Sequence, residues 1–271
     1  MPAQTFFEQP ILSSPYDKPS LHWELDLQGR PTDKILGARR RAELISAIPA
    51  PRKRARSEQA EMIYDTGHGL SSDVQEFNPT PIINELRQEV ETWRNLPNPE
   101  QWQVTPVTAN LLRHWRALQR DTSRPIRPFF CQLEAVETAI WLAEVAPKAG
   151  RRGRRFLDWL GDANASATTP GAPDLFRVAL KLATGAGKTT VMAMLIAWQA
   201  INAARSRNSK LFSRGFLLIA PGITIRDRLR VLLPNDPENY YRRLDLVPTD
   251  LMPDLGAAKI VITNYHAFQL R

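Results

Sequence analysis

Cysteine and long apolar runs are both nearly absent from this chain. Cys131 is the only cysteine among 271 residues, which excludes an internal disulfide and a metal site built from cysteine thiolates. The longest apolar run, Val191 to Trp198, is far too short to cross a bilayer, and Met1 to Pro10 lacks the basic and apolar regions of a signal peptide. We therefore expect a cytoplasmic protein with no membrane partner.

Acidic residues are outnumbered by basic ones. The chain has 36 Lys and Arg against 28 Asp and Glu, a net charge of +8 and an isoelectric point near 9.9. A polyanionic partner such as nucleic acid explains this excess, although a solvated basic surface is its commoner cause. Hydrophobic residues make up 43% of the chain and include seven Trp, so a core of real size is expected.

A glycine-containing stretch between two apolar runs is the most informative part of the chain. The first run, Phe176 to Leu182, has the length of a strand, and the second, Thr190 to Ile201, has the length of a helix. The stretch between them is Ala183-Thr184-Gly185-Ala186-Gly187-Lys188-Thr189. Strand, loop and helix in this order are the context of a phosphate-binding P-loop. A tight turn with no ligand is the alternative.

Each part of this loop has a chemical task in nucleotide binding. Gly185 and Gly187 let the backbone curl so that successive N–H groups point at a polyphosphate, and the helix N-terminus adds partial positive charge. Lys188 is placed to reach the β- and γ-phosphates, and the Thr189 hydroxyl is placed to bind Mg²⁺. Leu182 departs from the general pattern, in which a first glycine is usual.

The loop resembles motif I of superfamily 2 helicases and translocases, in which an apolar residue precedes Ala183-Thr184-Gly185. More narrowly, the chain resembles the motor subunit (Res, or R) of type III restriction enzymes. That resemblance implies a partial RecA-like P-loop NTPase fold with a parallel sheet, ATP and Mg²⁺ as cofactors, non-specific contact with the DNA backbone, and a modification methyltransferase subunit as partner. The intact relatives would be ATP-dependent translocases joined to an endonuclease.

Gln132 stands upstream of the loop where superfamily 2 proteins have a glutamine called the Q motif. It follows Phe129 and Phe130 and precedes an amphipathic segment that stops near Pro147. A glutamine amide matches the N6 and N7 edge of adenine, and either phenylalanine could stack on the base. The alternative is a glutamine at a helix start beside two core phenylalanines.

Two later stretches resemble motifs Ia and Ib of the same family. The apolar runs 216–220 and 259–263 predict strands of a parallel sheet buried on both faces. Thr224 and Arg226 follow the first strand, and Thr263 and Asn264 end the second; the resemblance implies that these residues contact the nucleic-acid backbone. Ordinary strand-to-helix connections are the alternative.

Three regions are expected along the chain. Residues 1–79 are punctuated by proline and form an irregular basic arm, in which only Lys34 to Ile48 could be helical. Residues 80–175 are helical, with helices from Pro81 and over 107–118. An insertion over 148–173 is expected to form a short helix and a flexible, solvated linker, and its arginine cluster is expected on a surface loop, with contact to nucleic acid as the alternative. Residues 176–271 form the incomplete RecA-like domain.

No Asp-Glu motif II appears before Arg271, so the chain resembles only the front part of its longer relatives. The family's hydrolysis needs Mg²⁺ held from two sides and an arginine that stabilises charge. We therefore expect ATP binding without hydrolysis, together with weak, salt-dependent DNA binding. A non-catalytic nucleic-acid-binding fragment and another P-loop enzyme, such as a small-molecule kinase, are the alternative functions.

Overall fold

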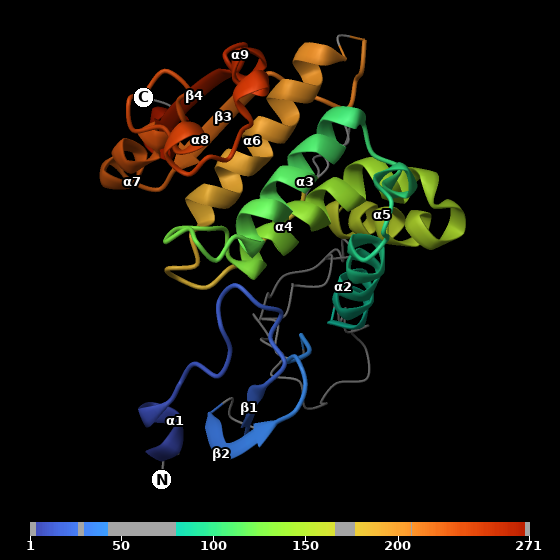
Figure 1. The fold of residues 1–271 in the computed structure, drawn as a ribbon, viewed down its shortest axis with the longest axis vertical. Coiled ribbons are helices and arrows are strands. Elements are labelled where there is room, and N and C mark those ends of the chain that lie inside the picture. The colour runs from blue at the N-terminus through green and yellow to red at the C-terminus, as the bar shows by residue number, and fades with distance from the viewer. Residues whose placement is uncertain (1–3, 27–29, 43–79, 166–176, 207, 269–271) are drawn as a thin grey trace, which may run out of the picture. The chain divides into compact units, whose positions relative to one another are not determined.

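The computed structural model describes residues 4–26, 30–42, 80–165, 177–206 and 208–268. Its described residues form helices and two small two-stranded sheets (Figure 1). The chain divides into two compact units. Unit 1 is residues 1–14, 18–95 and 146–179, and unit 2 is residues 15–17, 96–145 and 180–271. In the described part of the chain, no helix has both the length and the apolar character that a membrane span needs. The helical region 80–175 is thus divided between the units.

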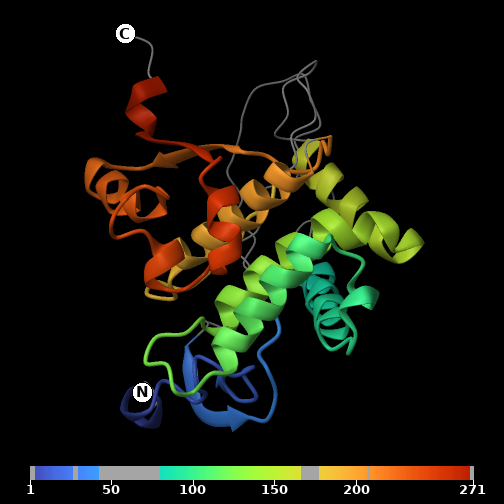
Figure 2. The same ribbon diagram turned by 45° about the horizontal axis from the view of Figure 1, so that its top comes forward.

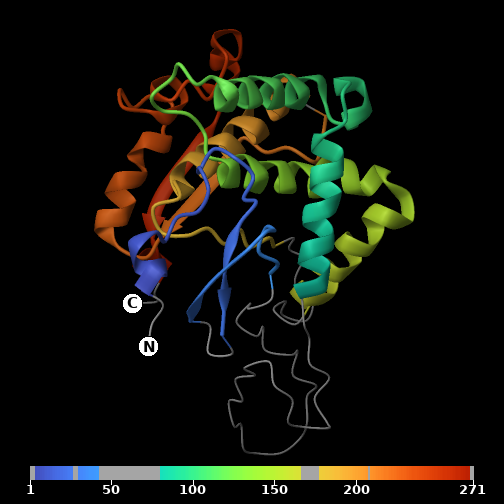
Figure 3. The same ribbon diagram turned by 60° about the horizontal axis from the view of Figure 1, so that its bottom comes forward.

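Unit 1 contains an antiparallel pair of strands where an irregular arm was expected. Helix α1, Gln4–Glu8, is followed by β1, His22–Leu25, and β2, Pro31–Leu36, which pair with Trp23 opposite Ile35 (Figure 3). The prediction of a helix over 34–48 is therefore wrong for residues 34–36, because these residues belong to β2 and form backbone hydrogen bonds with β1. Its remainder from 43 and the basic cluster 52–56 lie outside the described residues.

Two further helices of unit 1 interact through charges. Helix α2, Thr80–Arg94, begins within a residue of the expected start, and α5, Gly150–Ala165, follows the short 3₁₀ turn η3, Ala146–Lys148. The arginines expected on a surface loop lie instead in the first turns of α5, where Arg152 and Arg155 form ion pairs with Glu89 and Glu85 of α2. The insertion therefore contains the expected short helix, and this helix also includes the arginine cluster.

Unit 2 is built on three long helices. They are α3, Pro106–Arg120, α4, Phe130–Ile140, and α6, Lys188–Arg205, and α3 and α4 both pack against α6 (Figure 2). Thr105 caps α3 by accepting a hydrogen bond from the Thr108 N–H, and proline occupies the first helical position, where its missing N–H costs nothing. The helix expected over 107–118 is confirmed, and the short 3₁₀ helix η1, Pro99–Trp102, precedes it.

A buried carboxylate joins the three helices. Glu144 lies in the π-helical turn η2, Trp141–Val145, that continues α4, and only 2% of the residue is exposed. It accepts hydrogen bonds from the Thr105 N–H at 2.8 Å, the Thr108 hydroxyl at 2.7 Å and Trp198 Nε1 at 2.8 Å. The Asn202 amide donates to the same Thr108 hydroxyl at 3.0 Å. These hydrogen bonds join η2 to the start of α3 and to α6.

The parallel sheet of unit 2 has two strands among the described residues. These are β3, Gly215–Ala220, and β4, Lys259–Asn264, with Gly215 opposite Lys259 and Ala220 opposite Asn264. Between them come five short elements: α7, Ile223–Arg228; η4, Leu229–Leu232; α8, Tyr240–Arg243; η5, Thr249–Leu251; and α9, Met252–Leu255. The 3₁₀ turn η6, Tyr265–Phe268, follows β4.

Both strands were expected to be buried on both faces, and this expectation is wrong. Leu217, Ile219 and Val261 are more than half exposed, so apolar side chains cover one face of the pair without being buried there. An unbroken apolar run indicates that both faces of a strand can be buried, but burial requires a layer on each side.

The strand expected before the P-loop is also not found. Phe176 lies outside the described residues, and residues 177–183 have no regular secondary structure. A strand needs a neighbour with which to exchange backbone hydrogen bonds, and β3 pairs only with β4 in the described part of the chain. Among the described residues, the fold is therefore a mixture of helices and small sheets, and no RecA-like sheet carries the loop there.

Candidate functional site

The loop before α6 has the backbone conformation that its two glycines permit. Gly185 has φ 81° and Gly187 has φ 73°, both in the left-handed region that side chains with a Cβ rarely adopt. Helix α6 begins directly afterwards, with Lys188 and Thr189 as its first residues. The N–H groups of Gly187, Lys188 and Thr189 have no hydrogen-bond partner among the described residues, as is usual in the first turn of a helix. The loop therefore presents several free donors in one place.

Lys188 folds back over this loop. Its Nζ donates a hydrogen bond to the Ala183 carbonyl at 2.9 Å, across the turn formed by Thr184 to Gly187. The residue is exposed and forms no ion pair in the described part of the chain. An ammonium group that is bonded only to a neutral carbonyl can exchange that partner for a phosphate oxygen, which binds it more strongly.

Gln132 is attached to the loop from the side. Its Oε1 accepts the Phe129 N–H at 3.0 Å and closes the start of α4, while its Nε2 donates to the Ala186 carbonyl at 2.9 Å across 54 residues of sequence. The residue is only 5% exposed. A Cβ built on Gly187 would lie 2.2 Å from the same Nε2, so the glycine is also required by the close approach of this amide. In this structure Gln132 positions the loop 183–189.

The residues present fit a magnesium nucleotide in part. The Gln132 amide has two donor hydrogens and two acceptor lone pairs, and the two bonds described above leave one of each, as the N6 and N7 edge of adenine requires. The half-buried Thr189 follows Lys188 at the helix start, where a hydroxyl can bind Mg²⁺. Among the described residues, no group of three His, Cys, Asp or Glu could hold a metal ion. Such an ion would take its remaining ligands from phosphate oxygens and water.

The sequence stretch around Tyr16 is a neighbour of this site that motif spacing does not reveal. The Tyr16 ring meets Phe129 edge to face at 5.4 Å between ring centroids, and the Arg127 guanidinium lies 3.9 Å from the Tyr16 ring centroid. The Phe130 N–H donates to the Pro15 carbonyl at 2.9 Å.

Cys131 lies one residue before Gln132 in the first turn of α4. Its side chain reaches the surface, yet neighbouring atoms cover the thiol in part, and this desolvation raises the pKa of Cys131 above its ordinary value. The thiolate is the reactive form, so the environment makes this cysteine less nucleophilic rather than more.

The two motif-like loops after the strands come together at one sheet edge. Because β3 and β4 are parallel and Ala220 pairs with Asn264, the segment containing Thr224 and Arg226 begins beside Thr263 and Asn264. Thr224 is exposed, whereas the Arg226 guanidinium donates to Asp227 Oδ1 at 2.9 Å. A carboxylate already bound to Arg226 reduces its attraction for a phosphate. This edge thus offers hydroxyl, amide and backbone donors more readily than free charge.

Three features define the geometry of this loop. They are the left-handed glycines, the bond from Lys188 to the Ala183 carbonyl, and the bond from Gln132 to the Ala186 carbonyl. No protein-family model, curated protein or solved structure matches the chain.

Proposed function

We propose that this chain binds ATP and Mg²⁺ through the loop 183–189 and acts as the N-terminal part of an ATP-dependent DNA translocase or helicase subunit, of the kind found in type III restriction enzymes. The observation that carries the proposal is the loop itself, with two left-handed glycines followed at once by Lys188 at the start of an 18-residue helix. Such a loop collects backbone N–H groups and the positive end of a long helix at one point, which suits a polyphosphate.

Binding exchanges partners within the loop. Lys188 leaves the Ala183 carbonyl and binds phosphate oxygens, while the N–H groups of Gly187, Lys188 and Thr189 donate to the same polyphosphate. Bound magnesium neutralises phosphate charge, and the Thr189 hydroxyl is its protein ligand in this chain. Gln132 keeps its bond to Ala186 and turns its remaining donor and acceptor to adenine, so base recognition and loop geometry depend on the same amide.

The proposed DNA contacts follow from the edge where β3 and β4 end. Thr224, Thr263 and Asn264 lie there, and their hydroxyl and amide groups bind phosphates without reading bases. Translocation also requires motion between domains that is driven by the nucleotide. We propose this motion only for the longer proteins that this chain resembles in part.

Nucleotide binding can be tested with a fluorescent ATP derivative labelled on the ribose, titrated into the protein in the presence of Mg²⁺ and then displaced by unlabelled ATP or GTP. Replacing Lys188 by Ala removes charge-assisted hydrogen bonds of about 1.5–3 kcal/mol in total, so the affinity should fall by about 10- to 150-fold. Lys181→Ala is the matched control, because Lys181 is an exposed lysine just before the loop and outside it.

Base recognition is tested in the same titration. The wild-type protein should prefer ATP to GTP, and Gln132→Ala should lose both the preference and part of the affinity, because the loop loses the bond to Ala186. Equal loss of affinity in the Lys188 and Lys181 variants would contradict the proposed phosphate site. If the ratio of ATP to GTP affinity is unchanged in Gln132→Ala, Gln132 does not recognise the base and only positions the loop.

A further inference from the structure

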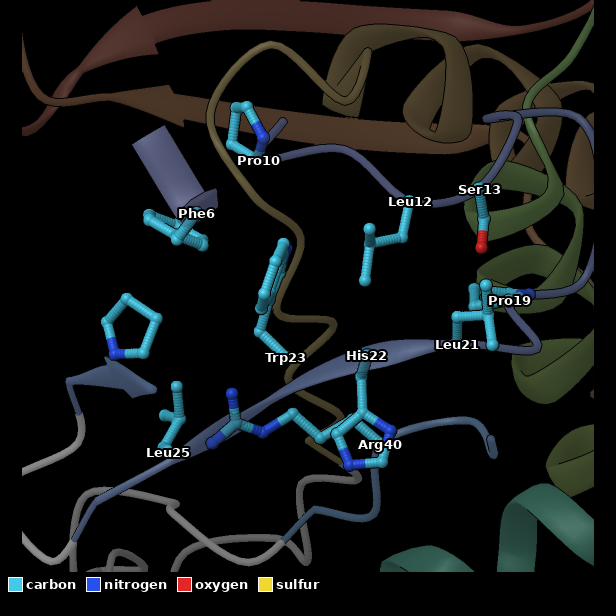
Figure 4. A pocket seen from close by; sticks show the side chains of 11 residues that line it. Phe6, Pro10, Leu12, Ser13, Pro19, Leu21, His22, Trp23, Leu25 and Arg40 are labelled. Carbon is cyan, nitrogen blue, oxygen red and sulfur yellow. The ribbon is translucent and has the colours of Figure 1, made fainter. Parts of the chain in front are cut away.

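Unit 1 contains a pocket of about 470 Å³ that takes no part in the proposed nucleotide site, whose residues belong to unit 2 (Figure 4). This volume is within the range of pockets that hold small molecules. The lining comes from α1, the segment after it, β1, the first residue of β2 and the segment after β2. Its members are Phe6, Pro10, Leu12, Ser13, Pro19, Leu21, His22, Trp23, Leu25, Pro31 and Arg40.

The apolar walls are rigid. Trp23 is 6% exposed, its Nε1 donates to the Gln9 carbonyl at 3.3 Å, and its ring meets Phe6 edge to face at 5.8 Å. In the close view of Figure 4, Phe6 and Leu12 lie on the two sides of Trp23. Three prolines complete the lining, and their rings have little freedom to rotate into the space. The pocket therefore does not need to reorganise to accept a flat apolar body.

The polar groups of the lining have unused capacity. The Ser13 hydroxyl oxygen is buried and has no hydrogen-bond partner in the described part of the chain. His22 Nδ1 lies 2.7 Å from the Ala38 carbonyl, so it must donate, and in the neutral ring Nε2 is left as a free acceptor. The Arg40 guanidinium has no ion-pair partner among the described residues. The unpaired guanidinium of Arg40 is thus free to bind an anionic group.

The charge of the pocket selects the sign of its ligand. The lining contains Arg40 and His22 and no carboxylate, so its only fixed charge is positive. Aromatic and proline rings beside an unpaired guanidinium suit a molecule that is flat and apolar over most of its surface and anionic at one end.

We propose that this pocket binds a small aromatic anion, with the rings against Trp23 and the prolines and the carboxylate, sulfonate or phosphate group on Arg40. The proposal is independent of the nucleotide site and holds whether or not the loop 183–189 binds ATP.

A matched pair of probes separates the charge from the rings. The anion 8-anilinonaphthalene-1-sulfonate and the neutral N-phenyl-1-naphthylamine share a ring system, and both fluoresce when they leave water. We expect the full chain to bind the anion about three- to tenfold more tightly than the neutral probe, because the contact with the exposed Arg40 guanidinium is charge-assisted but partly screened by water. Added salt should reduce the preference.

Three variants decide whether the binding occurs in this pocket. Arg40→Gln should abolish the preference for the anion and leave the neutral probe unaffected, while Arg40→Lys should retain most of it. Arg30→Gln is the matched control, because Arg30 is exposed in the same unit and does not line the pocket. Leu12→Trp fills the space and should weaken both probes.

Circular dichroism and a thermal melt show whether each variant is folded. If Leu12→Trp does not fold, the two Arg40 variants still decide whether the anion binds in this pocket. Equal affinity of the wild type for the two probes would overturn the proposal. So would an unchanged preference for the anion in Arg40→Gln, which would place the dye on some other apolar surface.

Discussion

Glu144 provides the sharpest test of what holds unit 2 together. The proposed change is Glu144→Gln, which preserves the shape of the side chain and replaces one carboxylate oxygen by an NH₂ group. Oε1 of the carboxylate accepts from the Thr108 hydroxyl and from Trp198 Nε1, and Oε2 accepts from the Thr105 N–H. In either orientation of the glutamine amide, its NH₂ group faces at least one of these donors.

The cost follows from the bonds that are lost or weakened. With the amide oxygen toward Thr108 and Trp198, the bond to the Thr105 N–H is lost and a buried donor is left unsatisfied, at about 1–3 kcal/mol. The two remaining bonds become neutral ones and lose about 1 kcal/mol between them. The free energy of unfolding should therefore fall by about 2–4 kcal/mol, and the urea midpoint by about 1 M.

Urea unfolding followed by tryptophan fluorescence measures this loss, since Trp198 itself donates to Glu144. Glu100→Gln is the control, because Glu100 is an exposed glutamate in the same unit and its replacement should change stability by no more than about 0.5 kcal/mol. Equal urea midpoints for the wild type and Glu144→Gln would refute the view that this carboxylate holds the three helices.

Two other changes test packing and reactivity. Gly153→Ala should destabilise unit 1 by about 1–3 kcal/mol, because the new Cβ would lie 2.0 Å from the Ala146 carbonyl oxygen. Gly161→Ala in the same helix meets open space and should stabilise the protein by about 0.5–1 kcal/mol. Thermal melts compare the two variants, and equal effects on stability would contradict the close approach at Gly153. Because the pKa of Cys131 is raised, the folded chain should react with iodoacetamide more slowly at pH 8 than the urea-unfolded chain. The rate of the folded chain should rise as the pH is increased further. Mass spectrometry of the single thiol measures both rates, and an equal or faster rate for the folded chain would contradict this expectation.

Local patterns in the sequence predict the helices of this chain well. The apolar spacing after Pro81, the spacing over 107–118 and the run that becomes α6 all depend on contacts within a few residues. The parallel strands are found for the same reason, since β3 and β4 are short apolar runs with turns on either side.

What the sequence does not reveal depends on distant partners. Residues 177–183 have the composition of a strand, but strand formation depends on a neighbour that no local pattern specifies. The same is true of Leu217 and Val261, whose hydrophobicity predicts burial without saying what would cover them. In the candidate site, the glycines and Lys188 follow from spacing, whereas the bond from Gln132 to Ala186 joins residues that nothing in the sequence connects.

Neither unit is a continuous piece of chain, and this affects the order in which the protein can fold. Residues 15–17 belong to unit 2 although the chain on both sides of them belongs to unit 1, and residues 146–179 return to unit 1 after the helices of unit 2 have begun. During synthesis, Tyr16 is made long before Gln119, whose amide donates to its carbonyl, and β1 is made long before α5. Tyr16 must therefore wait for a residue 103 positions later in the chain before this bond can form, and closing such a long loop is an entropic cost that slows folding. A cut anywhere between residues 17 and 146 would divide both units.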